Sequence, residues 1–276
     1  MRGLQMDTYN SFAATLVPVL LATSRDEGTS VPADARAFTR EAVDLLRNWN
    51  YHEDADSPAA AYYNAVWSNL LHLTFADEPR GAVQPEGGSR WFEVVGSLLA
   101  DEESPFWDDK RTPTVVEQRD QILGQAMYQA RVELTAHLGK DPRSWRWGAL
   151  HQLSLQAQPF SGSSVPAPVR SLFDIGSFRL GGGSSLVDAN GWDASIPGNY
   201  SVNVVPSMRM VVDLQHLDAS TWVDLTGVSG HPWSPHFSDQ TKRWVEGEAY
   251  PWPFSRKAVE EAETDRLVLE PGPDTS

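Results

Sequence analysis

Two histidines and an aspartate in the last quarter of the chain are residue types that bind metals. They occur as His231-x4-His236-x2-Asp239. Imidazole and carboxylate groups hold zinc when three or four of them converge. Helical ligand pairs are three or four residues apart, whereas His231 and His236 are five apart with two prolines between them. The favoured interpretation is therefore a Gly/Pro-rich turn whose histidines hydrogen-bond to the backbone.

The same segment places serine hydroxyls beside imidazoles, which raises the possibility of a serine nucleophile. Gly227-Val-Ser-Gly230 is one residue short of the Gly-x-Ser-x-Gly nucleophile elbow. Catalytic triads assemble in space and occur in unrelated chain orders, so closeness in sequence is weak evidence for one. We assign no triad from the sequence.

Two further features could carry chemistry, but a structural role is the favoured interpretation of each. The Gly181–Gly183 run has no nearby lysine and precedes a strand-like segment, so it predicts close backbone approach or positive φ instead of a phosphate loop. Arg209 and Asp213 are four residues apart on a predicted strand and would share a face. Paired, partly buried charges are the favoured interpretation, because a buried charge without a partner is costly.

Tryptophan is abundant, with 11 residues in the chain. Such rings could form a sugar-stacking platform, and Trp145 and Trp147 would be the first residues to test. Aromatic side chains more often fill a core while their polar atoms find hydrogen-bond partners. A carbohydrate-binding protein is therefore the less favoured alternative.

The composition excludes several classes of function. The 276 residues carry a formal charge of −15, which argues against binding nucleic acid or anionic membranes. Cysteine is absent, which excludes disulfides, thiolate catalysis and cysteine-ligated metals. We expect no signal peptide at Met1–Asp7, which lacks an apolar h-region. The apolar run Leu16–Ala22 is interrupted by Pro18 and is too short to span a bilayer.

Residues 1–143 are predicted to be mainly helical and residues 144–276 strand-rich. Together they form one incomplete α+β domain. Helices are expected from Thr8, from Pro32, from the Ser57-Pro58 start signal, over Trp91–Leu99, and from a capping box at Thr114–Glu117 to Gly139. Strands are expected at Ser185–Asp188, Tyr200–Val205, Met208–Leu214, Thr221–Thr226 and Leu267–Leu269.

A set of motifs in fixed order resembles one family over nearly the whole chain. The motifs are Leu4–Asp7, Val17–Leu21, Trp49, Asp56–Ala60, Trp67, Trp145–His151, Gly181–Gly183, Ser207–Leu214, Gly227–Gln240 and Trp244. Together they resemble the C-terminal part of a penicillin acylase (penicillin amidase) β subunit, in the N-terminal-nucleophile hydrolase superfamily.

The resemblance implies an αββα sandwich that hydrolyses amides carrying an apolar acyl group, such as penicillins or N-acyl homoserine lactones. It implies a precursor cleaved into two chains, with the new N-terminal serine as nucleophile and its own α-amine as base. Members are typically secreted or periplasmic and often bind calcium.

The same resemblance places the nucleophilic serine, the oxyanion asparagine and the calcium carboxylates upstream of Leu4. We therefore expect a C-terminal fragment with no catalytic residue, inactive alone and completed by an upstream β segment and an α chain. The alternative is a non-catalytic α+β module that complements a partner chain. The matching motif residues are expected to be structural: Trp147, Gly148, His151, Arg209, Asp213, Gly230, Ser234, His236, Asp239 and Gln240.

Overall fold

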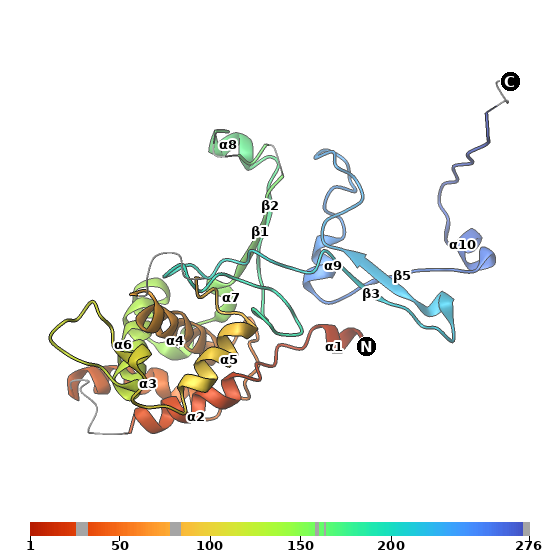
Figure 1. Cartoon of the computed structure of the whole chain (residues 1–276). Coiled ribbons are helices and arrows are strands. Elements are labelled where there is room, and N and C mark those ends of the chain that lie inside the picture. Colours follow the sequence, from red (N-terminus) through yellow and green to blue (C-terminus); the bar gives the residue numbers. More distant parts are fainter. Residues whose placement is uncertain (26–32, 78–83, 158–159, 163, 273–276) are drawn as a thin grey trace. The chain divides into compact units, whose positions relative to one another are not determined.

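The computed structural model describes residues 1–25, 33–77, 84–157, 160–162 and 164–272. Its contacts divide the chain into two compact units, Gly3–Pro206 and Ser207–Ser276, the latter together with Met1–Arg2. The chain thus passes from one compact unit to the other after Pro206, whereas its composition changes from helical to strand-rich near residue 144. Figure 1 follows the chain through both units. Each unit is described by itself.

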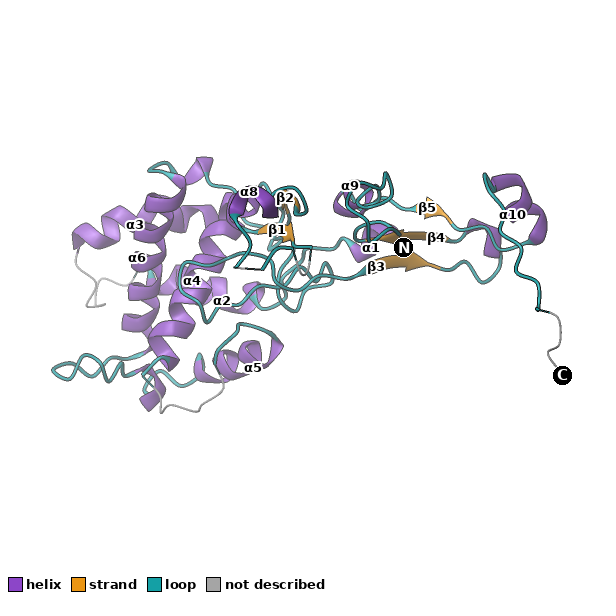
Figure 2. Ribbon diagram, turned by 90° about the horizontal axis from the view of Figure 1, so that it is seen from above, coloured by secondary structure: helices purple, strands orange, loops and turns teal. Residues whose placement is uncertain are grey.

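The unit Gly3–Pro206 is built on a layer of helices, purple in Figure 2. α4 lies at its centre, with buried side chains on all sides and extensive contacts with α3 and α6. Its alanines allow close helix approach, and its tyrosines and tryptophan fill the space between neighbours. The helices are α2 (Ala13–Thr23), α3 (Ala33–Leu46), α4 (Pro58–Phe75), α5 (Ser89–Leu98), α6 (Arg119–Leu138), α7 (Trp147–Leu150) and α8 (Ala167–Arg170), with α1 (Arg2–Gln5) at the unit boundary.

Most helix predictions are confirmed, but two starts were wrong. The helix expected from Thr8 begins at Ala13, and Tyr9 instead forms an isolated antiparallel bridge with His52. α2 contains Pro18, and α5 begins two residues before the expected Trp91. α6 begins at Arg119 instead of the predicted capping box at Thr114–Glu117. Glu117 accepts hydrogen bonds from the Asp109 backbone and the Thr112 hydroxyl, so it is not available to cap a helix at Thr114. The expected start at Pro32 lies outside the described residues.

Ser57 caps the central helix, as the sequence predicts, because its Oγ accepts from the backbone N–H of Ala60 at 3.1 Å. Ser57→Ala is expected to lower the free energy of unfolding by about 1 kcal/mol, the usual cost of losing such a cap. Urea unfolding followed by far-UV circular dichroism would measure it. Ser97→Ala is the control: Ser97 is exposed, its Oγ donates to Glu93 O within α5, and its loss is expected to change stability by less than about 0.5 kcal/mol. Equal effects of the two substitutions would contradict the capping role.

Two strands in this unit form an antiparallel hairpin that the sequence did not predict. β1 (Gln152–Leu155) pairs with β2 (Ile175–Arg179), and Figure 1 shows α8 at the tip of the hairpin. The predicted strands at Ser185–Asp188 and Tyr200–Val205 were wrong. Ser185 has a φ of 65°, which breaks an extended run, and Val204 forms only an isolated bridge with Gly191.

The unit Ser207–Ser276 contains an antiparallel sheet with the order β3-β4-β5. Its elements are β3 (Met208–Val211), β4 (Thr221–Asp224), α9 (Thr241–Val245), β5 (Tyr250–Pro251) and α10 (Arg256–Ala262). The strands at Met208 and Thr221 were predicted correctly, although β3 ends three residues early. The predicted strand Leu267–Leu269 was wrong, since these residues are exposed and form no ladder.

The chain is therefore an α+β protein, as predicted. Short 3-10 turns connect several elements, at Pro105–Trp107, Pro142–Ser144 and Leu217–Ala219. No helix among the described residues is long and apolar enough to cross a membrane.

Candidate functional site

The first motif cluster, Trp147, Gly148 and His151, lies at the junction between α7 and the hairpin. Trp147 is fully buried and its indole N–H donates to Gly182 O at 3.0 Å. The backbone N–H of Gly148 donates to Ala55 O at 2.7 Å, and a Cβ at this position would come within 3.0 Å of the Ala55 side chain. A side chain here would force its neighbours to move by a few tenths of an ångström, so glycine suits this close approach of two chain segments.

His151 is buried and stacks on Trp147, with ring centroids 4.4 Å apart and an interplanar angle of 11°. Its Nδ1 lies 3.0 Å from Tyr200 O and its Nε2 lies 3.0 Å from Asn190 O. Burial lowers the pKa of His151 to about 4, although both carbonyls favour the charged form. His151 is thus a neutral core histidine at neutral pH, whose single N–H donates to one of the two carbonyls.

Glu53 is a buried carboxyl beside the Gly181–Gly183 run, and the sequence analysis did not identify it. The Glu53 carboxyl is about 1% exposed and accepts a hydrogen bond from Asn10 Nδ2 at 2.6 Å. A Cβ on Gly183 would come 2.6 Å from Glu53 Oε2, and Gly182 N donates to Glu53 O at 2.8 Å. The close backbone approach predicted for Gly181–Gly183 is confirmed, and Gly182 has a φ of +74°.

Burial raises the pKa of Glu53 to about 7, against the opposing hydrogen bonds from Asn10 and Asn64. A carboxyl tuned toward neutrality is a feature of many catalytic sites. The cavity beside it, however, measures about 10 Å³ and is lined by residues such as Asn64 and Trp192. That volume is about the space needed for one water molecule, so no substrate fits there. Glu53 is therefore a structural carboxyl.

In the sheet unit, the expected pairing of Arg209 with Asp213 gives way to other contacts. Arg209 is buried and its guanidinium lies over the Trp244 ring, 4.0 Å from the centroid, while Nη1 donates to Trp244 O. β3 ends at Val211, so Asp213 lies in the following turn. Its Oδ1 accepts the backbone N–H groups of Gln215 and His216 at 3.0 Å. The sequence correctly predicted a buried arginine but not its aromatic partner.

The second motif cluster is the loop that contains Gly230, Ser234, His236, Asp239 and Gln240, and hydrogen bonds within the sheet unit close it. Ser229 N donates to His236 O at 3.0 Å, Ser234 Oγ accepts from His236 N at 3.2 Å, and Asp224 N donates to Gln240 Oε1 at 2.8 Å. Gln240 thereby attaches the loop to β4. Nothing in the structure requires glycine at Gly230, which has open space around it.

His236 and Asp239 form an exposed pair, with Nδ1 and Oδ2 separated by 2.9 Å. In catalytic triads, an aspartate orients the histidine through a hydrogen bond of this kind. Ser234 Oγ, two residues before His236, accepts from the backbone N–H of His236 and is not hydrogen-bonded to its ring in the described contacts. Within the described part of the chain, no group of three His, Asp or Glu side chains could hold a metal ion. The loop therefore supplies neither a triad nor a metal centre.

Burial contradicts a sugar-stacking role for Trp145 and Trp147, the two residues named for that test. Trp145 and Trp147 are 0% exposed, so neither ring can stack on a glycan. Trp145 instead donates its indole N–H to Gly139 O and packs under the Arg131 guanidinium. Both tryptophans are core residues.

Comparison with known proteins places these motifs in a family context. The family model described as penicillin amidase matches residues 1–261. The acyl-homoserine lactone acylase QuiP of Pseudomonas aeruginosa is 28% identical over 97% of this chain and 34% of its own length. The penicillin acylase 2 proenzyme of Pseudomonas sp. SE83 is 30% identical over 87% of this chain and 29% of its own length. The chain thus spans about a third of these relatives.

The solved structure of the thermostable penicillin G acylase from Alcaligenes faecalis has a similar fold. It superposes with a TM-score of 0.52, covering 97% of this chain and 48% of that chain, at 18% sequence identity. At that identity the similarity concerns the fold alone.

Proposed function

Because the chain belongs to the penicillin amidase family, we propose that it is the C-terminal scaffold of an acyl amidohydrolase whose nucleophile comes from polypeptide outside these 276 residues. The observation that carries this proposal is the length of the match. The family model matches residues 1–261 of this chain, yet the chain covers only 34% and 29% of the two relatives' own lengths. The two motif clusters support it, since their side chains hold the fold together and form no nucleophile–base pair.

The sheet unit supports the need for further polypeptide. Alternate residues of β3 and its continuation are exposed, at 48% for Met208, 39% for Met210, 42% for Val212 and 87% for Leu214. β3 also forms one edge of its sheet, with β4 as its neighbour. An exposed apolar strand face is a typical contact surface for another chain. An upstream β segment or α chain would cover it.

The proposed substrates are amides with an apolar acyl group, by analogy with the acyl-homoserine lactone and penicillin acylases. The attacking group would be an N-terminal serine that uses its own α-amine as base. Calcium, where the complete enzyme binds it, would be held by the missing part, because the described residues bring no suitable ligand group together. We therefore derive no step through a metal.

The purified chain is expected to hydrolyse neither a chromogenic phenylacetyl anilide nor an N-acyl homoserine lactone above the rate of a mock purification. The reason is that neither motif cluster brings a nucleophile and a base together, and that the proposed nucleophile lies outside these 276 residues. Co-expression with the polypeptide encoded directly upstream is expected to restore turnover. Hydrolysis by the chain alone, copurifying with it through two columns, would contradict the proposal.

The second candidate function is a non-catalytic α+β module that complements a partner chain, and the exposed apolar face of β3 favours it equally. Size-exclusion chromatography of the chain with the upstream polypeptide, followed by an amidase assay of the isolated complex, separates the two. A stable, inactive complex with the upstream polypeptide would indicate the module, whereas an active complex would indicate the enzyme.

A further inference from the structure

One face of the sheet unit carries two of the chain's five methionines. Met208 and Met210 lie two residues apart on β3, so their side chains project from the same face. Their exposed fractions are 48% and 39%. Trp222 on β4 lies directly opposite Met210, and its indole N–H donates to Met208 Sδ at 3.2 Å. These three side chains form one patch, which we call the methionine face.

The opposite face of the same sheet is buried. Arg209 and Val223 lie directly opposite each other on β3 and β4, and both are buried. The guanidinium of Arg209 lies over the Trp244 ring of α9. The methionine face is therefore the exposed side of the β3–β4 pair.

The upstream polypeptide is the partner that this face fits, and here the inference rests on the proposed function. The chain covers only 34% and 29% of the lengths of its two relatives, so most of the complete protein lies outside it. Methionine side chains are flexible and polarizable, and they suit apolar contact surfaces between chains. Such a surface keeps its affinity only while its thioethers stay apolar.

The thioether sulfur is the atom of this face that a mild oxidant changes. The sulfur attacks one oxygen of hydrogen peroxide, an S–O bond forms, and the O–O bond breaks. The second oxygen leaves as water after proton transfer, so that sulfur is oxidised by two electrons and peroxide is reduced. The product is a polar sulfoxide. A methionine sulfoxide reductase reverses the step with two thiols, which become a disulfide as water is released.

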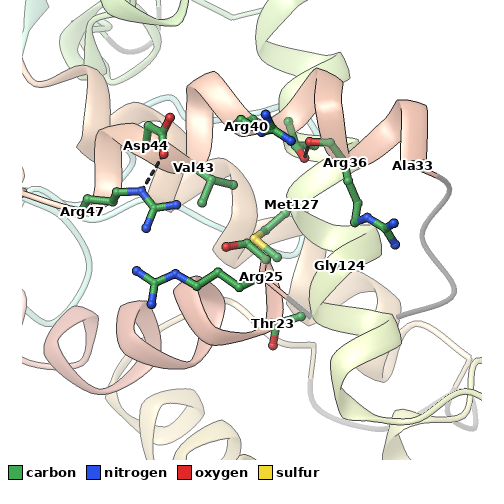
Figure 3. Close-up of a pocket in the computed structure, with 12 residues that line it drawn as sticks. Thr23, Arg25, Ala33, Arg36, Arg40, Val43, Asp44, Arg47, Gly124 and Met127 are labelled. Atoms are coloured by element: carbon green, nitrogen blue, oxygen red, sulfur yellow. Dashed lines mark hydrogen bonds and ion pairs between the residues drawn. The ribbon is translucent and has the colours of Figure 1, made fainter. Parts of the chain in front are cut away.

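Exposure distinguishes Met208 and Met210 from the methionines of the helical unit. Met127 lines a pocket between α2, α3 and α6, shown in Figure 3, yet its exposed fraction is only 3%. Met6 is half-buried. Met1 is 81% exposed and serves as an internal reference for an accessible thioether. The chain has no cysteine that would compete for the oxidant.

We propose that Met208 and Met210 form a reversible oxidation site that controls attachment of the upstream polypeptide. Reduced, the two thioethers are buried against the partner. Oxidised, they carry sulfoxide oxygens, and burying such an oxygen costs free energy unless a donor meets it. The Trp222 indole N–H can donate to an oxygen on Met208 as it donates to the sulfur, so the contact between β3 and β4 persists. Oxidation thus releases the partner without unfolding the sheet.

Peroxide treatment of the full chain, followed by peptide mass spectrometry, tests the site itself. Met208 and Met210 are expected to gain one oxygen each well before Met127, while the far-UV circular dichroism spectrum stays unchanged. Methionine sulfoxide reductase is expected to restore the original masses. Oxidation of Met127 as fast as of Met208 and Met210, or loss of the circular dichroism signal, would overturn the proposal.

Isothermal titration calorimetry with the upstream polypeptide tests the control of binding. Only the chain is oxidised, and peroxide is removed before mixing. Oxidation is expected to weaken binding by about tenfold or more, and reduction to restore it. The double variant Met208→Leu, Met210→Leu keeps the side-chain volume but cannot form a sulfoxide, so it is expected to bind tightly before and after peroxide.

Met6→Leu is the matched control, since it removes a methionine outside the sheet unit and is expected to leave the response to peroxide intact. Equal binding by the reduced and the oxidised chain, or an equal loss of binding by the oxidised double variant, would overturn this inference and leave the proposed function standing. Absence of binding by the reduced chain would overturn both.

Discussion

Trp147→Ala is expected to lower the free energy of unfolding by about 3–5 kcal/mol, the range for removing a fully buried large aromatic side chain. Trp147 is 0% exposed and contacts the rings of His151, Trp192 and Tyr200, at centroid distances of 4.4, 5.9 and 5.9 Å. Its indole N–H donates to Gly182 O, which would be left buried without this donor. Loss of the ring thus opens a cavity and breaks a hydrogen bond together.

Chemical denaturation followed by far-UV circular dichroism measures this effect, with two matched variants. Trp147→Phe retains a ring but loses the donor, so it is expected to cost less than the alanine substitution. Trp233→Ala removes a tryptophan that is 72% exposed and is expected to change stability by less than about 0.5 kcal/mol. If Trp147→Ala and Trp233→Ala were equally stable, the core role of the α7 motif would be wrong.

The helices could be predicted because their signals are local. Ser57-Pro58 marks the start of α4 by side-chain capping and a fixed proline φ, and both effects act within one turn. The end of α6 at Gly139 follows for the same reason, since glycine adopts the observed φ of +98° without strain. The competing box at Thr114–Glu117 failed because Glu117 accepts hydrogen bonds from Asp109 and Thr112.

The strands and the buried polar groups depend on contacts between distant segments. β1 exists because Gln152 and Leu153 pair with Arg179 and Phe178, and no local pattern specifies that pairing. Glu53 stands in the sequence between a histidine and an aspartate, which indicates an exposed loop. The one available signal was the Gly181–Gly183 run, which indicates close approach without saying to what.

Glu53 and His151 give the free energy of unfolding two opposite dependences on pH. Glu53 has a pKa of about 7 in the fold and about 4.5 when unfolded, so the folded state binds more protons between these values. Stability from Glu53 is complete below about pH 4.5 and declines as the pH rises to about 7. His151 has a pKa of about 4 in the fold and 6.5 when unfolded, so its contribution increases from about pH 4 to about pH 6.5.

Each contribution amounts to about 3 kcal/mol across its window, because one pKa unit corresponds to about 1.4 kcal/mol. In the unmodified protein the two slopes nearly cancel between about pH 4.5 and 6.5. Single substitutions are expected to expose them. Glu53→Gln leaves His151 alone, so the free energy of unfolding should increase with pH across this window. His151→Gln leaves Glu53 alone, so it should decrease.

Denaturant unfolding at a series of pH values between 4 and 8 measures these slopes, which are independent of any constant loss of stability that the substitutions cause. The double variant Glu53→Gln, His151→Gln is expected to restore a nearly flat profile. Asp141→Asn serves as the control, because Asp141 is exposed and its pKa is lowered chiefly by its hydrogen bond from the Arg143 side chain. Parallel profiles for Glu53→Gln and the unmodified chain would show that Glu53 is ionised in the fold, in contradiction to its burial.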